Sequence, residues 1–347
     1  MKIRDVRACQ PHSADAPPDW RSSLGQILVS IETSDAIVGF GVGGGGAASV
    51  HVIGAVFREM LVGREVEPVE LHFERLYRAS LAYVRKGLVI MALSGIDLAL
   101  WDLRGKAAGK PIHELLGGAK HHRMPMYASL GQDPAQAVAQ GYQAVKLHLP
   151  PVHTEAERKL VLTTVQQARQ DIGPHVRLMT DAFMNWDVLS ALALAGPFAE
   201  LGVEWLEEPL APDDFIGYAE LSRRTSIPIA GGEHEYTAAG FRELAERRLH
   251  AILQPDVTWC GGMTELVKIY KIATEHGLKV CPHRGAEIWA LHAIAALEPH
   301  DPLPEASRQW ITWLIGQPQP EHGWITVPSQ PGFGVEVEEA TLMSSLG

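Results

Sequence analysis

The sequence predicts an α/β protein in which a parallel (β/α) barrel follows a smaller α+β domain. Short apolar runs recur through residues 124–284, and each of them ends in polar or charged residues. Amphipathic stretches with helical spacing separate these runs. Strands that alternate with helices at intervals of about 20–30 residues are typical of parallel βα units. The length of 347 residues suits one barrel and an accessory domain.

The first part of the chain has the pattern of an α+β domain. Residues 26–33 and 37–42 carry alternating apolar side chains on either side of Ser34-Asp35, which predicts a β-hairpin. Residues 91–116 have helical apolar spacing, which Gly109-Lys110-Pro111 interrupts. We predict that this domain spans residues 1–122 and is completed by a turn-rich tail, about 316–347, and that the barrel spans residues 123–315.

Seven runs have the composition of barrel strands. They are residues 124–130, 144–150, 176–182, 203–209, 228–234, 251–257 and 278–284. An eighth strand is expected near Glu305–Trp310, and eight units would close a modified TIM barrel. An open doubly wound sheet is the alternative, but no glycine-rich phosphate fingerprint follows the first strand.

Composition and charge exclude several classes of partner. The formal net charge of −11 argues against nucleic acid or an anionic membrane, because both require a basic surface. No apolar run approaches the ~20 residues that cross a bilayer. The three cysteines, Cys9, Cys260 and Cys281, form no CxxC pair, which disfavours a disulfide framework and a thiolate zinc site. We therefore predict a cytoplasmic protein that acts on a small molecule.

Three carboxylates end three successive predicted strands: Asp181, Glu207 and Glu233. The carboxyl ends of barrel strands point into the site, and the spacing of about one βα unit makes these acids neighbours. Such carboxylates repel one another unless a cation lies among them, and all-oxygen ligands suit Mg²⁺. Pairing with Arg or Lys on helices is the alternative, but it fits one acid better than three. Strand alternation predicts that Glu207 faces the site and that Glu208 faces away.

The neighbouring strand ends carry candidates for acid–base chemistry. Asp256 beside His283 would fix the imidazole tautomer, which makes this pair a candidate general base and acid. Mg²⁺ with three carboxylates has a net charge of −1, so Lys146 is expected to help hold an anionic substrate. His148, on the same strand face, is either a second base or a polar wall. Arg284 either binds the substrate or forms a surface salt bridge.

Residues 43–46 are four consecutive glycines, a composition that also occurs in ligand-binding loops. It is not a phosphate loop, because no strand–helix junction with Lys-Ser/Thr follows it. A flexible lid and a plain surface loop are the two interpretations that remain.

Several motifs resemble a known family. They are SGIDLALWDLRGKAAGKPIHELLGG, VEWLEEPL, GGEHE, LQPDVTWCGGMTE and VCPHR, and they occur in order along nearly the whole chain. Together they are similar to the enolase superfamily in its mandelate racemase subgroup, with GEH and QPDVxWCGG closest to the acid-sugar dehydratases. The resemblance implies an N-terminal capping domain over a modified barrel. It also implies Mg²⁺ on the three carboxylates, catalysis by the Asp256–His283 pair, and a homo-oligomer.

The resemblance adds roles for further residues. His234 matches a histidine that contacts the substrate, and Glu305 matches an acid that hydrogen-bonds the forming enediolate. Arg21, in the segment that closes over the substrate in such enzymes, is a further expected contact. Lys146-Leu147-His148 departs from the Lys-x-Lys pattern of many members, which disfavours a two-base racemase.

These observations predict a reaction. We expect Mg²⁺-dependent dehydration of a sugar acid to a 2-keto-3-deoxy acid, through α-proton abstraction and an enediolate. A racemase, an epimerase or a cycloisomerase with the same metal site is the alternative.

Overall fold

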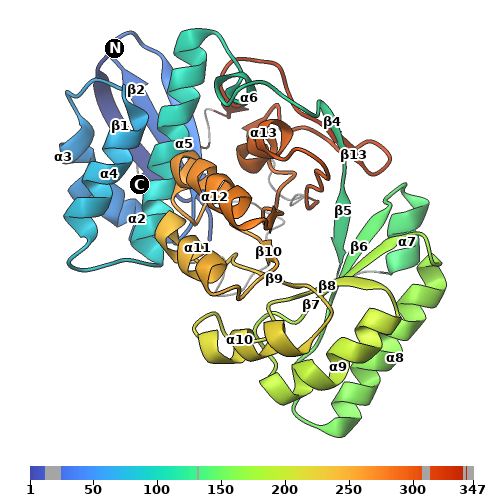
Figure 1. Ribbon diagram of the computed structural model, residues 1–347. Coiled ribbons are helices and arrows are strands. Elements are labelled where there is room, and N and C mark those ends of the chain that lie inside the picture. Colours follow the sequence, from blue (N-terminus) through green and yellow to red (C-terminus); the bar gives the residue numbers. More distant parts are fainter. Residues whose placement is uncertain (12–24, 131–132, 307–312, 339–340, 342–347) are drawn as a thin grey trace.

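The computed structural model describes residues 1–11, 25–130, 133–306, 313–338 and 341 (Figure 1). The fold is mixed α/β, with an antiparallel N-terminal sheet and a curled parallel sheet, as the sequence predicts. Arg21 and the end of the expected eighth strand lie outside the described residues. Among the described helices, none combines the length and the apolar character that spanning a membrane requires.

The N-terminal part contains the predicted hairpin within a three-stranded sheet of order β1-β2-β3. Its elements are β1 (Ile3–Cys9), β2 (Ile27–Thr33), β3 (Val38–Gly43), α2 (Gly46–Val52), η1 (Ile53–Phe57), α3 (Arg58–Leu61), α4 (Val69–Ser80), α5 (Leu88–Ala108) and α6 (Ile112–Leu115). Helix α5 packs directly on β3, because a Cβ at Gly41 would lie 2.2 Å from the carbonyl oxygen of Gly95. Gly109, with φ of 63°, ends α5 as its C-cap residue.

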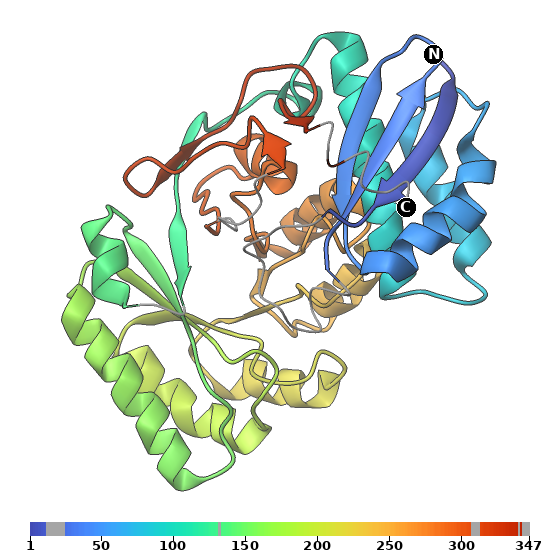
Figure 2. The same cartoon turned by 180° about the vertical axis from the view of Figure 1, so that it is seen from behind.

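The parallel sheet has the order β11-β10-β9-β8-β7-β6-β5 and confirms the seven predicted strands. The elements are β5 (Tyr127–Leu130), α7 (Pro134–Ala139), β6 (Ala144–His148), α8 (Glu155–Ile172), β7 (Arg177–Asp181), α9 (Val188–Glu200), β8 (Val203–Glu207), α10 (Phe215–Arg224), β9 (Ile229–Gly231), α11 (Thr237–Glu246), β10 (Ile252–Leu253), α12 (Gly262–His276), β11 (Lys279–Val280) and α13 (Ile288–Leu297). Figure 2 shows α8, α9 and α10 on the outside of this sheet.

Residues 303–306 take the eighth position of the barrel. Glu305 forms a parallel bridge with Tyr127 of the first barrel strand. A separate buried cluster has one residue from each strand β5 to β10, the residue that directly follows β11, and Leu303: Tyr127, Ala144, Met179, Trp205, Ala230, Ile252, Cys281 and Leu303. The barrel therefore has a packed interior, and its chemistry is confined to the strand ends.

The N-terminal domain contacts the barrel through α5, which lies between the small sheet and α12 (Figures 1 and 2). Ser94 Oγ accepts a hydrogen bond of 2.9 Å from Gly261 N–H, and Asp97 Oδ2 accepts one of 2.9 Å from Thr264 N–H. Side chains of α5 thus cap the start of α12, where backbone donors have no partner inside the helix. This contact places the loop between β10 and α12 beside the N-terminal domain.

The tail contacts helices α5 and α6 of the N-terminal part. Ile112 N–H donates to Gly332 O at 3.0 Å, and Phe333 N–H donates to Asp102 Oδ1 at 2.9 Å. The remaining strands are β4 (Arg123–Pro125), β12 (Leu314–Ile315), β13 (Trp324–Thr326) and β14 (Glu336–Val337). Strand β12 pairs with β14, and β13 pairs with β4, so the tail also contacts the segment that enters the barrel.

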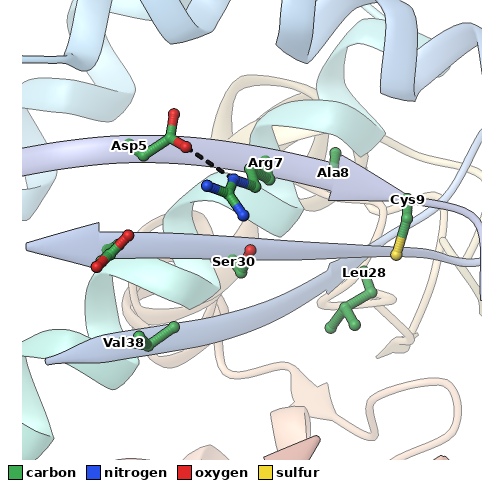
Figure 3. A pocket seen from close by; sticks show the side chains of 8 residues that line it. Asp5, Arg7, Ala8, Cys9, Leu28, Ser30 and Val38 are labelled. Atoms are coloured by element: carbon green, nitrogen blue, oxygen red, sulfur yellow. Dashed lines mark hydrogen bonds and ion pairs between the residues drawn. The ribbon is translucent and has the colours of Figure 1, made fainter. Parts of the chain in front are cut away.

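A small hollow on the N-terminal sheet contains none of the predicted site residues (Figure 3). Its charged side chains are paired, since Arg7 Nε donates to Asp5 Oδ2 at 2.7 Å. We assign no function to it.

Candidate active site

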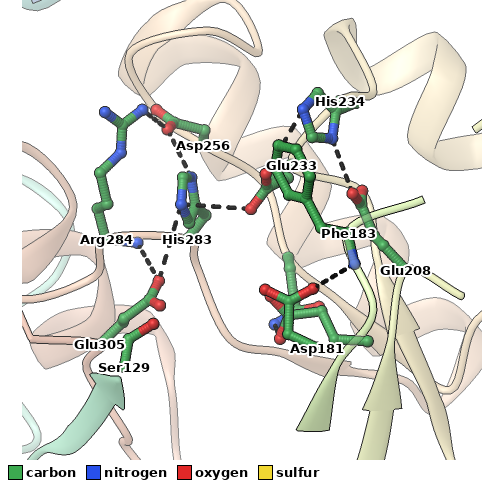
Figure 4. Close-up of polar contacts among 12 residues, drawn as sticks. Ser129, Asp181, Phe183, Glu208, Glu233, His234, Asp256, His283, Arg284 and Glu305 are labelled. Atoms are coloured by element: carbon green, nitrogen blue, oxygen red, sulfur yellow. Dashed lines mark hydrogen bonds and ion pairs between the residues drawn. The ribbon is translucent and has the colours of Figure 1, made fainter. Parts of the chain in front are cut away.

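Side chains from the carboxyl ends of several strands meet at one end of the barrel (Figure 4). Lys146 of β6 is only 1% exposed, and its ammonium donates to Glu207 Oε1 of β8. The same Nζ lies 3.1 Å from Glu305 Oε1 and 3.6 Å from Asp181 Oδ2. One buried cation therefore lies among three acids from three strand ends.

The cluster has strongly perturbed proton affinities. Burial raises the pKa of Glu207, and the nearby carboxylates add to this effect, although Lys146 opposes it. Burial alone would also raise the pKa of Asp181, but Lys146 and His148 hold it below its usual range. Burial likewise raises the pKa of Glu233. The surrounding protein therefore does not fully compensate the negative charge of Glu207 and Glu233, which favours the binding of a cation next to them.

Further hydrogen bonds orient two of the three acids next to Lys146. Glu207 Oε2 accepts from Trp205 Nε1 at 3.1 Å and from Gln254 Nε2 at 2.6 Å. Asp181 Oδ1 accepts from the backbone N–H of Phe183 at 2.9 Å. These partners fix the directions in which the remaining carboxylate oxygens face.

His148 lies at the end of β6 with 45% of its side chain exposed. Its Nδ1 is 3.2 Å from Asp181 Oδ2, and its Nε2 is 3.0 Å from Ser129 Oγ. The structure thus places His148 at the edge of the cluster, where both of its predicted roles remain open.

Asp256 and His283 form the predicted pair. His283 Nδ1 lies 2.9 Å from Asp256 Oδ2, whereas Asp256 Oδ1 accepts from the N–H and the hydroxyl of Thr258 at 2.8 and 2.7 Å. His283 Nε2 faces Glu233, with 3.2 Å to its Oε2. Burial disfavours the charged imidazole, but Glu233 and Asp256 raise the pKa of His283 to about 9.

Arg284 contacts the same pair and forms no surface salt bridge within the described residues. Its Nη2 donates to Asp256 Oδ2, and its backbone N–H donates to Glu305 Oε2 at 2.7 Å. The guanidinium carbon lies 4.7 Å from the centre of the Trp259 ring. The sequence left two interpretations of Arg284 open, and the structure places it inside the site, where its contact with substrate stays a prediction.

The expectation that Glu208 faces away from the site is wrong. Glu208 is 3% exposed, and its Oε2 lies 2.8 Å from Nδ1 of His234. Strand β8 ends at Glu207, and Glu208 has φ of 36°, so the alternation of a strand no longer applies to it. His234 Nε2 lies 3.5 Å from Glu233 Oε1, which puts Glu233 between two imidazoles (Figure 4).

Two overlapping sets of residues are candidate ligands of a metal ion, one predicted from the sequence and one that the described structure brings together. Asp181, Glu207 and Glu233 offer the predicted all-oxygen set. Glu208, Glu233 and His234 offer ligand atoms within 4.8 Å of one another. Hard cations such as Mg²⁺ prefer oxygen, which favours the first set, and Glu208 and His234 already satisfy each other. The donors present therefore fit a divalent cation, with Glu233 common to both sets.

Sequence reasoning missed Glu208 and gave no role to Trp259. The Glu-Glu pair in VEWLEEPL was a signal for Glu208, but strand periodicity assigned only one of the two acids to the site. Trp259 stands in the quoted motif LQPDVTWCGGMTE, and its ring centre lies 5.8 Å from the ring centres of both His234 and His283.

The chain matches two family descriptions that together cover most of it. Residues 19–117 match the N-terminal domain of mandelate racemase and muconate lactonizing enzyme, and residues 131–341 match the enolase C-terminal domain-like family. The L-rhamnonate dehydratase of Saccharopolyspora erythraea is 36% identical over 341 residues, which cover 92% of this chain and 87% of that protein.

Solved structures agree with these matches. The L-rhamnonate dehydratase of Gibberella zeae has a TM-score of 0.88 at 32% identity, with 98% of this chain and 94% of that chain covered. The 3,6-anhydro-D-galactonate cycloisomerase of Zobellia galactanivorans has a TM-score of 0.88 at 30% identity, with both chains fully covered at 100%.

The fold and the site define a barrel enzyme with a capping domain over an acidic cluster. The chain belongs to the enolase superfamily, in its mandelate racemase and muconate lactonizing enzyme group, and it is a homologue of L-rhamnonate dehydratase.

Proposed function

We propose that this enzyme dehydrates an aldonic acid, related in structure to rhamnonate, to the 2-keto-3-deoxy acid. The observation that carries the proposal is the orientation of His283. Asp256 occupies its Nδ1, which leaves Nε2 directed at the carboxylate cluster. A base placed beside a bound carboxylate can remove the proton from the adjacent carbon. The relatives named L-rhamnonate dehydratase support the choice of substrate class.

Asp181, Glu207 and Glu233 would hold Mg²⁺. When bound, the ion supplies positive charge that stabilises the negative charge developing on the substrate carboxylate. A relative of known structure was crystallised with Mg, the rhamnonate dehydratase of Gibberella zeae, which is 30% identical and has a TM-score of 0.88 over 99% of this chain and 95% of that chain.

The side chains of this chain perform the proton transfers. His283 Nε2 accepts the proton from C2, and Asp256 stabilises the imidazolium that forms. The C3–O bond then breaks, and the departing hydroxyl takes a proton to leave as water. The resulting enol tautomerises to the 2-keto-3-deoxy acid. When the C2 proton and the C3 hydroxyl leave from the same face, His283 supplies the second proton as well.

Lys146 and Glu305 would act on the developing enediolate. The buried ammonium of Lys146 adds positive charge next to the cluster, and Glu305 lies 3.1 Å from it. Preorganised charge of this kind stabilises the transition state without reorganisation of water. His234 and Arg284 are proposed to contact the hydroxyl groups of the substrate.

A cycloisomerase is the second candidate, because a cycloisomerase of known structure matches the whole chain. Such an enzyme uses the same proton abstraction but retains every atom of the substrate. Only dehydration lowers the mass of the product by one water.

The test is a screen of purified enzyme with Mg²⁺ against a library of aldonic and aldaric acids. We expect 2-keto acid, detected with semicarbazide, from five- or six-carbon aldonates, and loss of the signal with EDTA. Keto acid from no member of the library, with the metal still bound, would reject dehydration of sugar acids. A product of unchanged mass would instead support the cycloisomerase. The oligomeric state and the cytoplasmic location stay predictions of the sequence.

A further inference from the structure

Trp259 lies beside both imidazoles of the site, those of His234 and His283. It follows Asp256 in the loop after β10, and its backbone N–H donates to Asp256 O at 2.9 Å. Its ring centre is 5.8 Å from that of His234, at an interplanar angle of 46°, and 5.8 Å from that of His283, at 55°. The guanidinium of Arg284 lies over the indole, 4.7 Å from its centre, and anchors it as a cation–π contact.

The capping domain contacts the same indole through a glycine. Gly44 directly follows β3, and a Cβ at this position would lie 2.8 Å from Trp259 Nε1 and 3.0 Å from its Cδ1. The same Cβ would lie 3.1 Å from Met91 Sδ of α5, so an added methyl group at position 44 has little room to avoid the indole. The glycine run at residues 43–46 is therefore more than a surface loop, because its backbone packs against a side chain of the site.

We propose that Trp259 is a specificity-determining residue, which forms the wall of the substrate pocket between His234 and His283. Its aromatic surface would pack against the C–H bonds of the carbon chain of the substrate, which are the apolar part of a sugar acid. The capping domain sets the position of this wall through Gly44. The inference rests on the proposed function, because it assigns the residue that selects among acids of that class.

Two consequences distinguish this role from a purely structural one. A smaller ring at position 259 widens the pocket and changes the preference for chain length, which a structural residue does not alter. A methyl group at position 44 collides with the indole and displaces it, and a smaller ring at 259 removes the collision. The effects of the two substitutions are therefore coupled, as expected for residues in contact.

The experiment uses Gly44→Ala, Trp259→Phe and the double variant in the full-length enzyme. Gly54→Ala is the matched control, because an added Cβ there meets no atom within 4 Å. For each protein, kcat and KM are measured with five-, six- and seven-carbon aldonates, and the Kd of each acid is measured by calorimetry. Urea unfolding of all five proteins, wild type included, reports whether a variant is folded.

We expect Trp259→Phe to change the ratio of kcat/KM between the shortest and longest acids by about tenfold. Gly44→Ala is expected to lower kcat/KM by about tenfold, and the double variant to lie within about threefold of Trp259→Phe. Gly54→Ala is expected to match the wild type.

The two proposals fail in different ways. The absence of keto acid from every substrate would reject the dehydratase, whereas the Kd values would still report chain-length selection. An unchanged preference in Trp259→Phe, by kcat/KM and by Kd, would overturn the role of Trp259. If the effects of Gly44→Ala and Trp259→Phe on kcat/KM simply multiply in the double variant, the two residues are not coupled. That result would overturn the role of the capping domain.

Discussion

The Nδ1 atom of His283 lies 2.9 Å from Oδ2 of Asp256, and the opposite nitrogen faces Glu233. A cation bound to Glu233 would offset the charge that raises the pKa of His283, and the neutral imidazole then donates Nδ1–H to Asp256 and carries its lone pair on Nε2. Asp256 is in turn held by Thr258 and Arg284, so the base is fixed in one orientation. Preorganisation of this kind is what a proton transfer from carbon requires.

Replacement of His283 by Asn is expected to abolish dehydration while the fold is kept. Asn cannot accept a proton at the position of Nε2, so kcat should fall by at least about a thousandfold. The measurement is the rate of 2-keto acid formation, with circular dichroism as the check on folding. His175→Asn is the control, because His175 is exposed just before β7. Turnover near that of wild type in His283→Asn would refute the assignment of the base.

The two candidate ligand sets make opposite predictions for Mg²⁺ affinity. Asp181→Asn and Glu207→Gln should each weaken binding by at least about tenfold, because each removes a charged ligand. Glu208→Gln should have a much smaller effect, since Glu208 then lacks only its ionic contact with His234. Calorimetric titration with Mg²⁺ measures all three. Loss of binding in Glu208→Gln with retention in Glu207→Gln would assign the ion to Glu208, Glu233 and His234.

Replacement of Lys146 by Met should destabilise the protein. Lys146 is 1% exposed and contacts Glu207, Glu305 and Asp181, so its loss leaves buried carboxylates without a cation. Breaking a buried charge pair typically costs about 3–5 kcal/mol. Urea unfolding without metal measures the loss of free energy, and added Mg²⁺ should restore part of it. A variant as stable as wild type would show that these carboxylates are protonated at neutral pH.

The free energy of unfolding should decrease as the pH falls, because a buried histidine outside the site, His292, cannot readily bind a proton in the folded protein. His292 is 0% exposed, its Nδ1 accepts from His113 N–H at 3.2 Å, and its Nε2 donates to Phe333 O at 3.1 Å. Burial lowers the pKa of His292 to about 3, whereas an unfolded chain has about 6.5. Below pH 6.5 the unfolded state therefore binds a proton that the folded state does not, and stability falls as the pH falls toward 3.

The slope attributable to this group reaches about 1.4 kcal/mol per pH unit. Urea unfolding at several pH values between 7 and 4 should give a shallower slope for His292→Asn than for wild type, whatever the absolute stability of the variant. Equal slopes would mean that His292 is protonated in the folded protein.

The sequence predicts the fold well because strand and helix periods repeat along the barrel, and the spacing of the strand ends brings Asp181, Glu207 and Glu233 together. The alternation of side-chain directions along a strand no longer predicts where a side chain faces once the strand has ended. Glu208 turns into the site because its φ is positive, which no alternation rule reveals. The contact between Gly44 and Trp259 joins two domains and depends on a close approach that only three-dimensional packing shows. The position of Arg284 is likewise open from the sequence, whereas its contact with Asp256 puts it inside the site.

The most direct test of the account is a single reaction in D₂O followed by nuclear magnetic resonance. Wild type and His283→Asn are each incubated with Mg²⁺ and L-rhamnonate, the acid named for the relatives. The account predicts that wild type forms the 2-keto-3-deoxy acid with deuterium at C3, and that His283→Asn forms none. Wild-type substrate recovered unchanged, without deuterium at C2, while structurally similar aldonates also remain unreacted, would contradict it.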